Sequence, residues 1–116
     1  MIICVCGGRD YSNRDRVFRV LDAAVAVLGS DSVMIMNGAA RGADKLSSNW
    51  ATERGIQLSE FPANWDKHKN AAGPIRNREM LNAGFDLLVA FPGGRGTADM
   101  VNITKKAGIP VYEIFD

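Results

Sequence analysis

Glycine turns that follow apolar runs are the first feature of this chain that points to chemistry. The clearest is "PGGRGT" (92–97), which lies between "FDLLVAF" (85–91) and a stretch with helical character. Glycine permits positive φ angles and close approach of a ligand to the backbone. A helix that begins after such a turn offers unpaired N–H groups and the positive end of its dipole to an anion, most often phosphate. The alternative is a tight strand-to-helix turn without a ligand.

Two more glycine turns repeat this arrangement, "GGRDY" (7–11) and "NGAARGAD" (37–44). One such turn fits either interpretation, whereas several turns at one sheet edge favour an anionic ligand. Thr97 either caps its helix or donates its hydroxyl to a phosphate oxygen. From these turns we expect the ligand to contact Gly7, Gly8, Arg9, Gly38, Arg41, Gly42, Asp44, Pro92, Gly93, Gly94, Gly96 and Thr97.

Five arginines lie in or beside these turns or in "PIRNREM" (74–80), and their planar guanidinium groups suit bidentate binding of phosphate or carboxylate. Arg76 and Arg78 complete the set of expected ligand contacts. We expect two or three of the five arginines to contact the ligand and the rest to be solvated or paired with acids. Arg95, at a loop tip, is the expected bystander.

The carboxylates allow two interpretations. Asp44 and Asp99 lie in the first turns of expected helices, where an acid stabilises the helix dipole by about 0.3–1 kcal/mol. Alternatively they bind ribose hydroxyls or act as acid or base at a glycosidic carbon. Glu79 is a further candidate, or it steadies Arg76. The candidate catalytic residues are Arg76, Glu79 and Asp99.

The segment 62–73 is expected to be irregular and to act as a lid over the ligand. Trp65 either stacks on a base or anchors the segment on the core. His68 is the only histidine, and a lone histidine is weak support for catalysis.

Strand and helix patterns alternate along the whole chain. We expect strands at 2–7, 32–38, 56–61, 85–91 and 109–115, and helices at 12–29, 42–55, 74–84 and 97–108. Pro74 is expected to be the first residue of its helix. This alternation predicts one α/β domain over 1–116, Rossmann-like and doubly wound. Its mostly parallel five-stranded sheet has the order 3-2-1-4-5, with helices on both faces and the ligand between the first and fourth strands.

Composition excludes several classes of protein. The chain is 47% hydrophobic, which argues against disorder, and its 14 basic and 13 acidic residues argue against a strongly basic nucleic-acid binder. Cys4 and Cys6 are expected to point to one face of a buried strand, and no metal site or cofactor is predicted. No apolar run approaches the roughly 20 residues of a membrane span. Because Met1 leads directly into the first strand, we expect a cytoplasmic protein.

Four stretches together resemble the YspA-like family of the SLOG superfamily: "CGGRDY", "NGAARGADKLSSNWA", "FPANWDKHKNAAGPIRNREML" and "AFPGGRGTADMV". The resemblance implies binding of a nucleotide or a nucleotide-derived signal. Two distant relatives share parts of the pattern. "NGAARGAD" is similar to a motif of DNA-processing protein A, and "PGGRGTADM" is similar to the PGGxGTxxE motif of the LOG phosphoribohydrolases.

The LOG resemblance also places Arg76 and Met80 at that family's arginine and methionine positions. Its catalytic glutamate position is occupied by Met100, and Asp99 is the neighbouring acid. We therefore expect a nucleotide binder that senses, sequesters or carries its ligand, and a homo-oligomer. The alternative is an enzyme that hydrolyses or transfers at a nucleotide's N-glycosidic bond. Binding of single-stranded nucleic acid is the least expected function.

Overall fold

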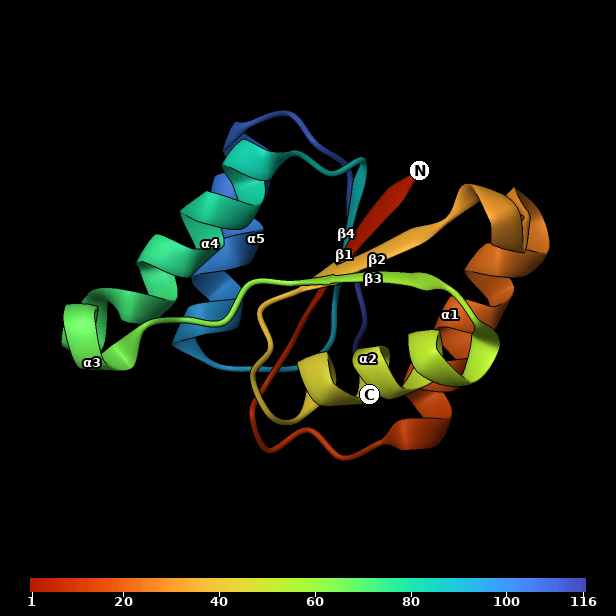
Figure 1. Ribbon diagram of the computed structural model, residues 1–116, viewed down its shortest axis with the longest axis horizontal. Coiled ribbons are helices and arrows are strands. Elements are labelled where there is room, and N and C mark those ends of the chain that lie inside the picture. The colour runs from red at the N-terminus through yellow and green to blue at the C-terminus, as the bar shows by residue number, and fades with distance from the viewer.

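The computed structural model describes residues 1–116, and its five strands form one parallel sheet in the order β3-β2-β1-β4-β5 (Figure 1). The predicted strand order is therefore confirmed. The strands are β1 (Ile2–Cys6), β2 (Met34–Asn37), β3 (Gln57–Glu60), β4 (Leu87–Ala90) and β5 (Val111–Glu113). The α-helices are α1 (Arg14–Leu28), α2 (Ala43–Arg54), α3 (Trp65–His68), α4 (Ala72–Ala83) and α5 (Arg95–Lys106).

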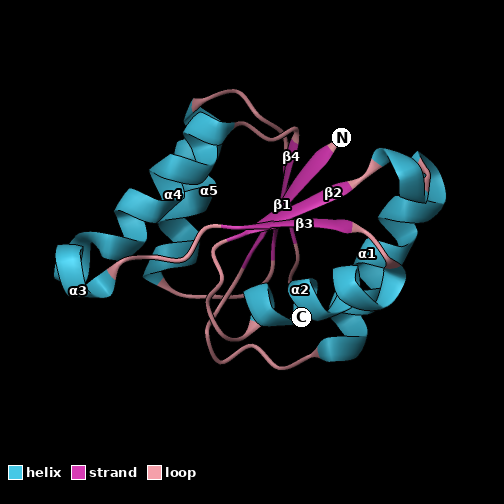
Figure 2. Cartoon of the chain, in the orientation of Figure 1, coloured by secondary structure: helices cyan, strands magenta, loops and turns pink.

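Two helix layers cover opposite faces of the sheet, α1 and α2 on one face and α4 and α5 on the other (Figures 1 and 2). Alternation along β1 explains the two cores. Ile3 and Val5 pack with residues of α1 and α2, whereas Cys4 and Cys6 pack with residues of α4 and α5. The prediction that both cysteines share one face is confirmed, and both are free thiols.

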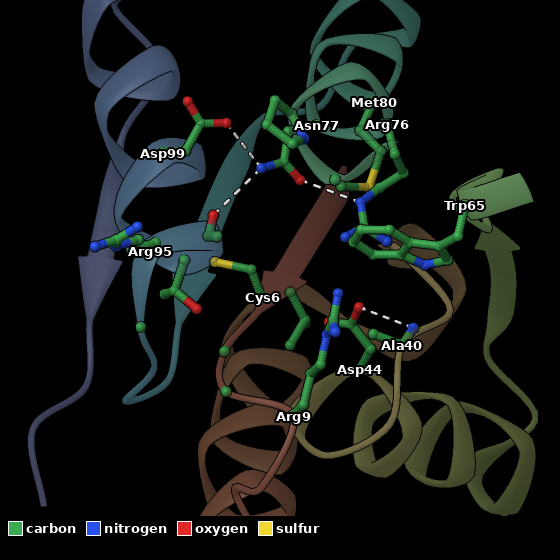
Figure 3. Close-up of a pocket in the computed structure, with 18 of the residues that line it drawn as sticks. Cys6, Arg9, Ala40, Asp44, Trp65, Arg76, Asn77, Met80, Arg95 and Asp99 are labelled. Atoms are coloured by element: carbon green, nitrogen blue, oxygen red, sulfur yellow. Dashed lines mark hydrogen bonds between the residues drawn. The ribbon is translucent and has the colours of Figure 1, made fainter. Parts of the chain in front are cut away.

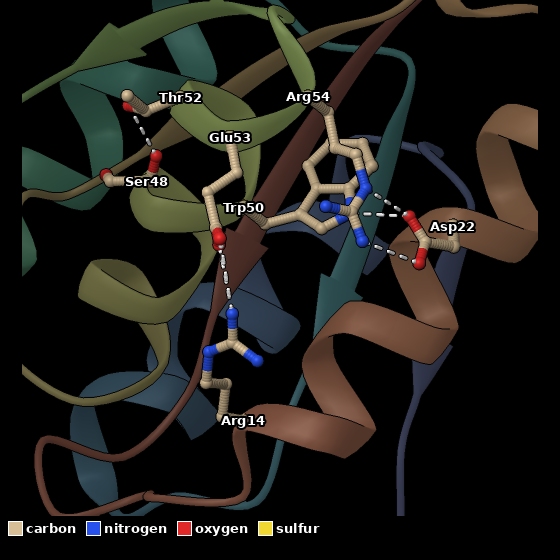
Figure 4. Close-up of polar contacts among 7 residues, drawn as sticks. All are labelled: Arg14, Asp22, Ser48, Trp50, Thr52, Glu53 and Arg54. Atoms are coloured by element: carbon tan, nitrogen blue, oxygen red, sulfur yellow. Dashed lines mark hydrogen bonds and ion pairs between the residues drawn. The ribbon is translucent and has the colours of Figure 1, made fainter.

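Polar contacts fasten α1 to α2 (Figure 4), on the side of the molecule away from α4 and α5 (Figure 1). The Asp22 carboxylate accepts hydrogen bonds from Trp50 Nε1 at 2.8 Å and from Arg54 Nε at 3.1 Å. These contacts lower the pKa of Asp22, the bond from Arg54 contributing most. Arg14 adds an ion pair with Glu53 at 3.0 Å.

The segment between β3 and β4 is more ordered than the sequence predicted. It contains α3 and a short 3₁₀ turn, η2 (Lys69–Ala71), and α4 begins at Ala72. The Asn64 side chain caps α3 by accepting a hydrogen bond from the Lys67 N–H at 3.1 Å. Pro74 is thus the third residue of α4, where a missing N–H costs nothing because the first-turn N–H groups have no helical partner.

The start of α5 is a second correction. The helix begins at Arg95, two residues before the predicted start at Thr97, and its N-cap is Gly94 without a side-chain hydrogen bond. Thr97 is therefore not the cap. No helix of the structure combines the length and apolar character that a membrane crossing requires.

Candidate functional site

A pocket of about 590 Å³ opens at the carboxyl ends of β1 and β4, where the strand order reverses (Figure 3). The predicted convergence of the three glycine turns is seen here, because each turn contributes to the lining. The segment from α3 to α4 forms a further wall. The residues that line the pocket are Val5, Cys6, Gly7, Gly8, Arg9, Ala40, Asp44, Trp65, Asn70, Gly73, Pro74, Arg76, Asn77, Met80, Gly94, Arg95, Gly96, Thr97 and Asp99.

Gly8 joins the three turns through its backbone. Its N–H donates to the Pro92 carbonyl at 2.9 Å, and its carbonyl accepts from the Ala43 N–H at 3.2 Å. Close packing requires glycine beside it, since a Cβ on Gly7 would lie 2.5 Å from Ala43 Cβ. The turns therefore form one connected edge of the pocket.

Three other predicted ligand glycines also have structural reasons. Gly42 has a φ of +77°, and a Cβ there would overlap the Gly8 carbonyl oxygen. A Cβ on Gly93 would lie 2.6 Å from the Gly8 nitrogen, and one on Gly38 would lie 2.7 Å from Arg76 Cζ. Gly38, Gly42 and Gly93 do not line the pocket, and their lack of a side chain lets the lining residues Gly8 and Arg76 pack closely against the turns.

Gly94 and Gly96 differ from these glycines, because a Cβ at either position would meet no atom within 4 Å. Both line the pocket at the start of α5. The first intrahelical hydrogen bond of α5 runs from the Ala98 N–H to the Gly94 carbonyl at 3.0 Å. The N–H groups of the preceding first turn have no helical partner, and no acid lies in that turn. This helix end is open to an anion.

Three of the five candidate arginines line the pocket: Arg9, Arg76 and Arg95. Arg76 donates through Nη1 to the Gly38 carbonyl, and burial lowers the pKa of its guanidinium. The Arg9 guanidinium lies 4.6 Å from the centre of the Trp65 ring. Figure 3 places Arg9 and Trp65 on one side of the pocket and Arg95 on the other.

The other two arginines lie outside the pocket lining. Arg41 is exposed and pairs with Asp10 at 3.4 Å. Arg78 is also exposed, and its Nη1 lies 3.7 Å from Asp99 Oδ2 and 3.2 Å from the Pro74 carbonyl oxygen. Arg95, the expected bystander, is thus in the lining, whereas Arg41 and Arg78 are not. The loop around Gly42 turns Arg41 outward, and the 3.6-residue period places Arg78 well away from Arg76 on α4.

Asp44 is the most buried carboxylate of the site, with 6% of its surface exposed. Its Oδ2 accepts a hydrogen bond from the Ala40 N–H at 3.2 Å. Burial raises the pKa of Asp44 to about 6, and hydrogen bonds from the backbone at Ala40 and Gly38 and the charge of Arg76 oppose this rise. A carboxyl group with such a pKa exists in both protonation states near neutral pH.

Asp99 also lines the pocket, on the side of α5, whereas Met100 is fully buried in the core against α4 and the sheet. The acid that neighbours the glutamate position of the LOG motif is therefore the one that faces the pocket. Glu79 is exposed on α4, does not line the pocket and makes no side-chain hydrogen bond or ion pair. The partners of Arg76 are Asn77 and Gly38, so the structure shows no contact for the alternative in which Glu79 steadies Arg76.

Asn77 is a site residue that the sequence analysis missed. It is 4% exposed, and its Nδ2 donates to Asp99 Oδ2 at 3.0 Å and to the Gly96 carbonyl at 3.2 Å. Its Oδ1 accepts from Arg76 Nε at 3.2 Å. Asn77 thus links α4 to the first turn of α5 and orients two charged lining residues. The sequence did contain one indication of its role, because Asn77 lies between the two candidate arginines Arg76 and Arg78.

Asn37, at the end of β2, was also missed. It is fully buried, its Nδ2 donates to Ser47 Oγ at 2.9 Å and to the Asp44 carbonyl at 3.1 Å, and its Oδ1 accepts from the Ala39 N–H at 2.9 Å. These bonds hold the 37–44 turn in place. His68 lies outside the pocket lining, and Trp65 lies within it.

Comparison with known proteins adds two findings. A family model described as the "YspA, cpYpsA-related SLOG family" matches residues 1–68, which include β1, β2 and the turns that follow them. The chain is also 34% identical over 121 residues to the "Gene 61 protein" of Mycobacterium phage D29, an alignment that covers 98% of this chain and 96% of the relative.

Proposed function

We propose that this protein, which belongs to the YspA, cpYpsA-related SLOG family, binds a nucleotide or nucleotide-derived ligand in the pocket between β1 and β4. The phosphate would lie on the N-terminal turn of α5, and the rest of the ligand would extend toward Trp65. A role in sensing, sequestering or carrying the ligand follows from binding without turnover.

One observation carries this proposal: the open N-terminus of α5 shares a single pocket with Arg9, Arg76 and Arg95. Unpaired backbone N–H groups and guanidinium groups are both strong partners for phosphate. The pocket volume of about 590 Å³ falls in the range of roughly 300–1,000 Å³ typical of small-molecule sites. Trp65 and the Arg9 guanidinium supply planar surfaces that suit a base.

Calorimetry tests the proposal with a panel of nucleoside monophosphates and NAD-derived nucleotides. We expect at least one member to bind, and Arg76→Ala to weaken it about tenfold or more, as expected for a charge-assisted hydrogen bond. Arg78→Ala is the matched control, since it lies on the same helix outside the lining. If a folded sample binds no member of the panel, the proposal is wrong.

A second candidate function is hydrolysis or transfer at the ligand's N-glycosidic bond. It is favoured by the presence of two carboxylates, Asp44 and Asp99, in the same pocket as Arg76. Either acid could stabilise an oxocarbenium-like centre. Mass spectrometry of the incubated nucleotides separates the two functions, because an enzyme frees the base and a binder returns the ligand intact. Base release that persists in both Asp44→Asn and Asp99→Asn variants would exclude these acids as its cause.

Self-association remains a prediction. Val27 on α1, Tyr112 on β5 and Phe115 near the C-terminus are large apolar residues with exposed fractions of 84%, 59% and 76%. Analytical ultracentrifugation measures the number of chains in the particle. Sedimentation as a monomer at all concentrations would contradict the expected homo-oligomer.

A further inference from the structure

Asp44 places a buried negative charge in a pocket that otherwise suits anions. The residue is 6% exposed, lines the pocket and takes part in none of the ion pairs of the structure. Burying an ionised carboxylate without a directly paired cation is costly. Because this cost falls on a residue that lines the pocket, we infer that the carboxylate contacts the ligand.

An ionised carboxylate only accepts hydrogen bonds, and its two oxygens have about four acceptor positions. The Ala40 N–H of the 37–44 turn donates to Asp44 Oδ2 at 3.2 Å, and the nearby Gly38 backbone also lowers the pKa of this carboxylate. The bond from Ala40 orients the carboxylate and leaves further acceptor capacity on its oxygens. A ligand group that meets Asp44 must therefore bring hydrogen-bond donors.

The two ends of the pocket carry opposite preferences. Figure 3 shows Asp44 with Arg9 and Trp65 on one side and the start of α5 with Arg95 and Asp99 on the other. A phosphate held at the open start of α5 leaves the Asp44 carboxylate to meet another part of the ligand, and Arg9 and Arg76 near Asp44 offset only part of its charge. The ligand needs an anionic group at one end and neutral donors at the other.

A ribose with free 2′ and 3′ hydroxyls meets this requirement, because its adjacent O–H groups can donate to the two oxygens of one carboxylate. Carboxylates bind ribose hydroxyls in this way in other doubly wound folds. We propose that Asp44 accepts hydrogen bonds from the ribose diol, so that the site takes 5′-ribonucleotides in preference to 2′-deoxynucleotides and to nucleotides phosphorylated at the 2′ or 3′ position. This inference rests on the proposed nucleotide function.

Calorimetry at pH 7.5 with matched pairs tests the inference: AMP with dAMP, GMP with dGMP, CMP with dCMP and UMP with dUMP. We expect each ribonucleotide to bind about tenfold or more tightly than its deoxy partner, whatever the base, because a hydrogen bond to a charged group is lost. Adenosine 2′-monophosphate and 3′-monophosphate should bind more weakly than AMP. These comparisons use the unmodified protein.

Asp44→Asn completes a double-mutant cycle. We expect it to weaken the ribonucleotides to the level of the deoxynucleotides, with little effect on the latter. Asp10→Asn is the matched control, because Asp10 is exposed in a neighbouring turn and lies outside the pocket lining. It should leave the ribose preference unchanged.

The possible failures are distinguishable. Equal binding of both members of each pair would overturn the inference and leave the proposed function standing. A preference that follows the amino group of the base, with UMP weak and the deoxy partners equal, would also overturn it, because Asp44 would then contact the base. If no nucleotide binds, the inference and the proposed function fail together.

Discussion

Two helices, α2 and α5, begin at the same edge of the sheet. The first turn of α2 is packed against other parts of the chain, whereas the first turn of α5 is open. Both α2 and α5 follow a glycine N-cap, Gly42 and Gly94, that forms no side-chain capping bond. In α2 the chain itself fills the space, since the Ala43 N–H donates to the Gly8 carbonyl and an acid, Asp44, lies in the first turn. In α5 the first turn holds no acid, and the glycines border open space.

The difference shows that a glycine turn before a helix is not sufficient to make an anion site. The same local pattern gives a closed turn with an acid at α2 and an open turn at α5 that contains Arg95. What separates them is long-range contact, above all the approach of the turn after β1 to α2. The two turns thereby bring a buried carboxylate and an open helix N-terminus to the same pocket.

The largest expected effect comes from the same substitution at the two turns. Gly42→Ala must strain a residue at φ +77° and push against the Gly8 carbonyl oxygen, so we expect it to lower the free energy of unfolding by more than about 3 kcal/mol. Gly96→Ala adds a methyl group in open space within a helix and should change stability by about 0 to +1 kcal/mol. Urea denaturation measures both. Equal losses would contradict the contrast between a closed and an open turn.

The pH dependence of stability tests the charge of the closed turn. Burial raises the pKa of Asp44 from 3.8 to about 6, so between these values the folded state holds a proton that the unfolded state has released. This residue therefore stabilises the fold less as pH rises from about 4 to 6. At about 1.4 kcal/mol per pH unit the loss reaches about 3 kcal/mol at neutral pH.

We expect Asp44→Asn to remove this dependence, as measured by the difference in unfolding free energy between variant and wild type from pH 4.5 to 7.5. The difference isolates Asp44 from the other carboxylates. The charged or titratable groups near it are Arg76 on α4, Glu60 on β3, and Cys4 and Cys6 on β1. If the difference in unfolding free energy between variant and wild type does not change with pH over this range, ionisation of Asp44 does not destabilise the fold.

A smaller effect is expected for arginine on the two sides of α4. Arg76→Lys loses the fixed guanidinium that bonds to the Gly38 carbonyl, and we expect nucleotide affinity to fall about tenfold, or about 1.4 kcal/mol. Arg78→Lys should change affinity less than about twofold, because Arg78 is exposed outside the lining. Titration calorimetry compares them. Equal weakening by both variants would mean that the pocket lining does not define the site.

The smallest effect is expected at Glu79. Because its side chain is exposed and makes no hydrogen bond or ion pair, Glu79→Gln should change stability by less than about 0.5 kcal/mol and leave binding unaltered. Thermal unfolding and calorimetry provide the two measurements. A clear loss of binding would return Glu79 to the set of ligand residues.

The sequence predicted the fold well because its signals are local. Apolar runs bounded by glycine fix the strands, and residues such as Val17, Leu21 and Trp50 pack on the sheet as the helical period requires. The start of α5 was misplaced because glycine usually interrupts helices, whereas Gly96 lies in a first turn that needs few hydrogen bonds.

The pocket was predicted less completely. The converging turns follow from the strand order, but which arginine points inward depends on helix starts and loop contacts, as Arg95 and Arg41 show. Asn77 was missed because its importance comes from the first turn of α5, 19 positions away in the chain at Gly96. The place of Asn77 between two arginines drew attention to this part of α4 but did not indicate its contact with α5.

The burial of the two thiols of β1 determines how readily they are alkylated or oxidised. Burial raises the pKa of both Cys4 and Cys6, and the Asp44 carboxylate adds to the rise, so almost no thiolate exists at neutral pH. Alkylating agents and peroxides attack the thiolate, and Cys4 has no exposed surface, so its sulfur is unreactive while the sheet is intact. Each modification of Cys4 therefore marks a moment when β1 was uncovered, and slow labelling of this residue records how often the fold opens. Cys6 lines the pocket and is the comparison residue.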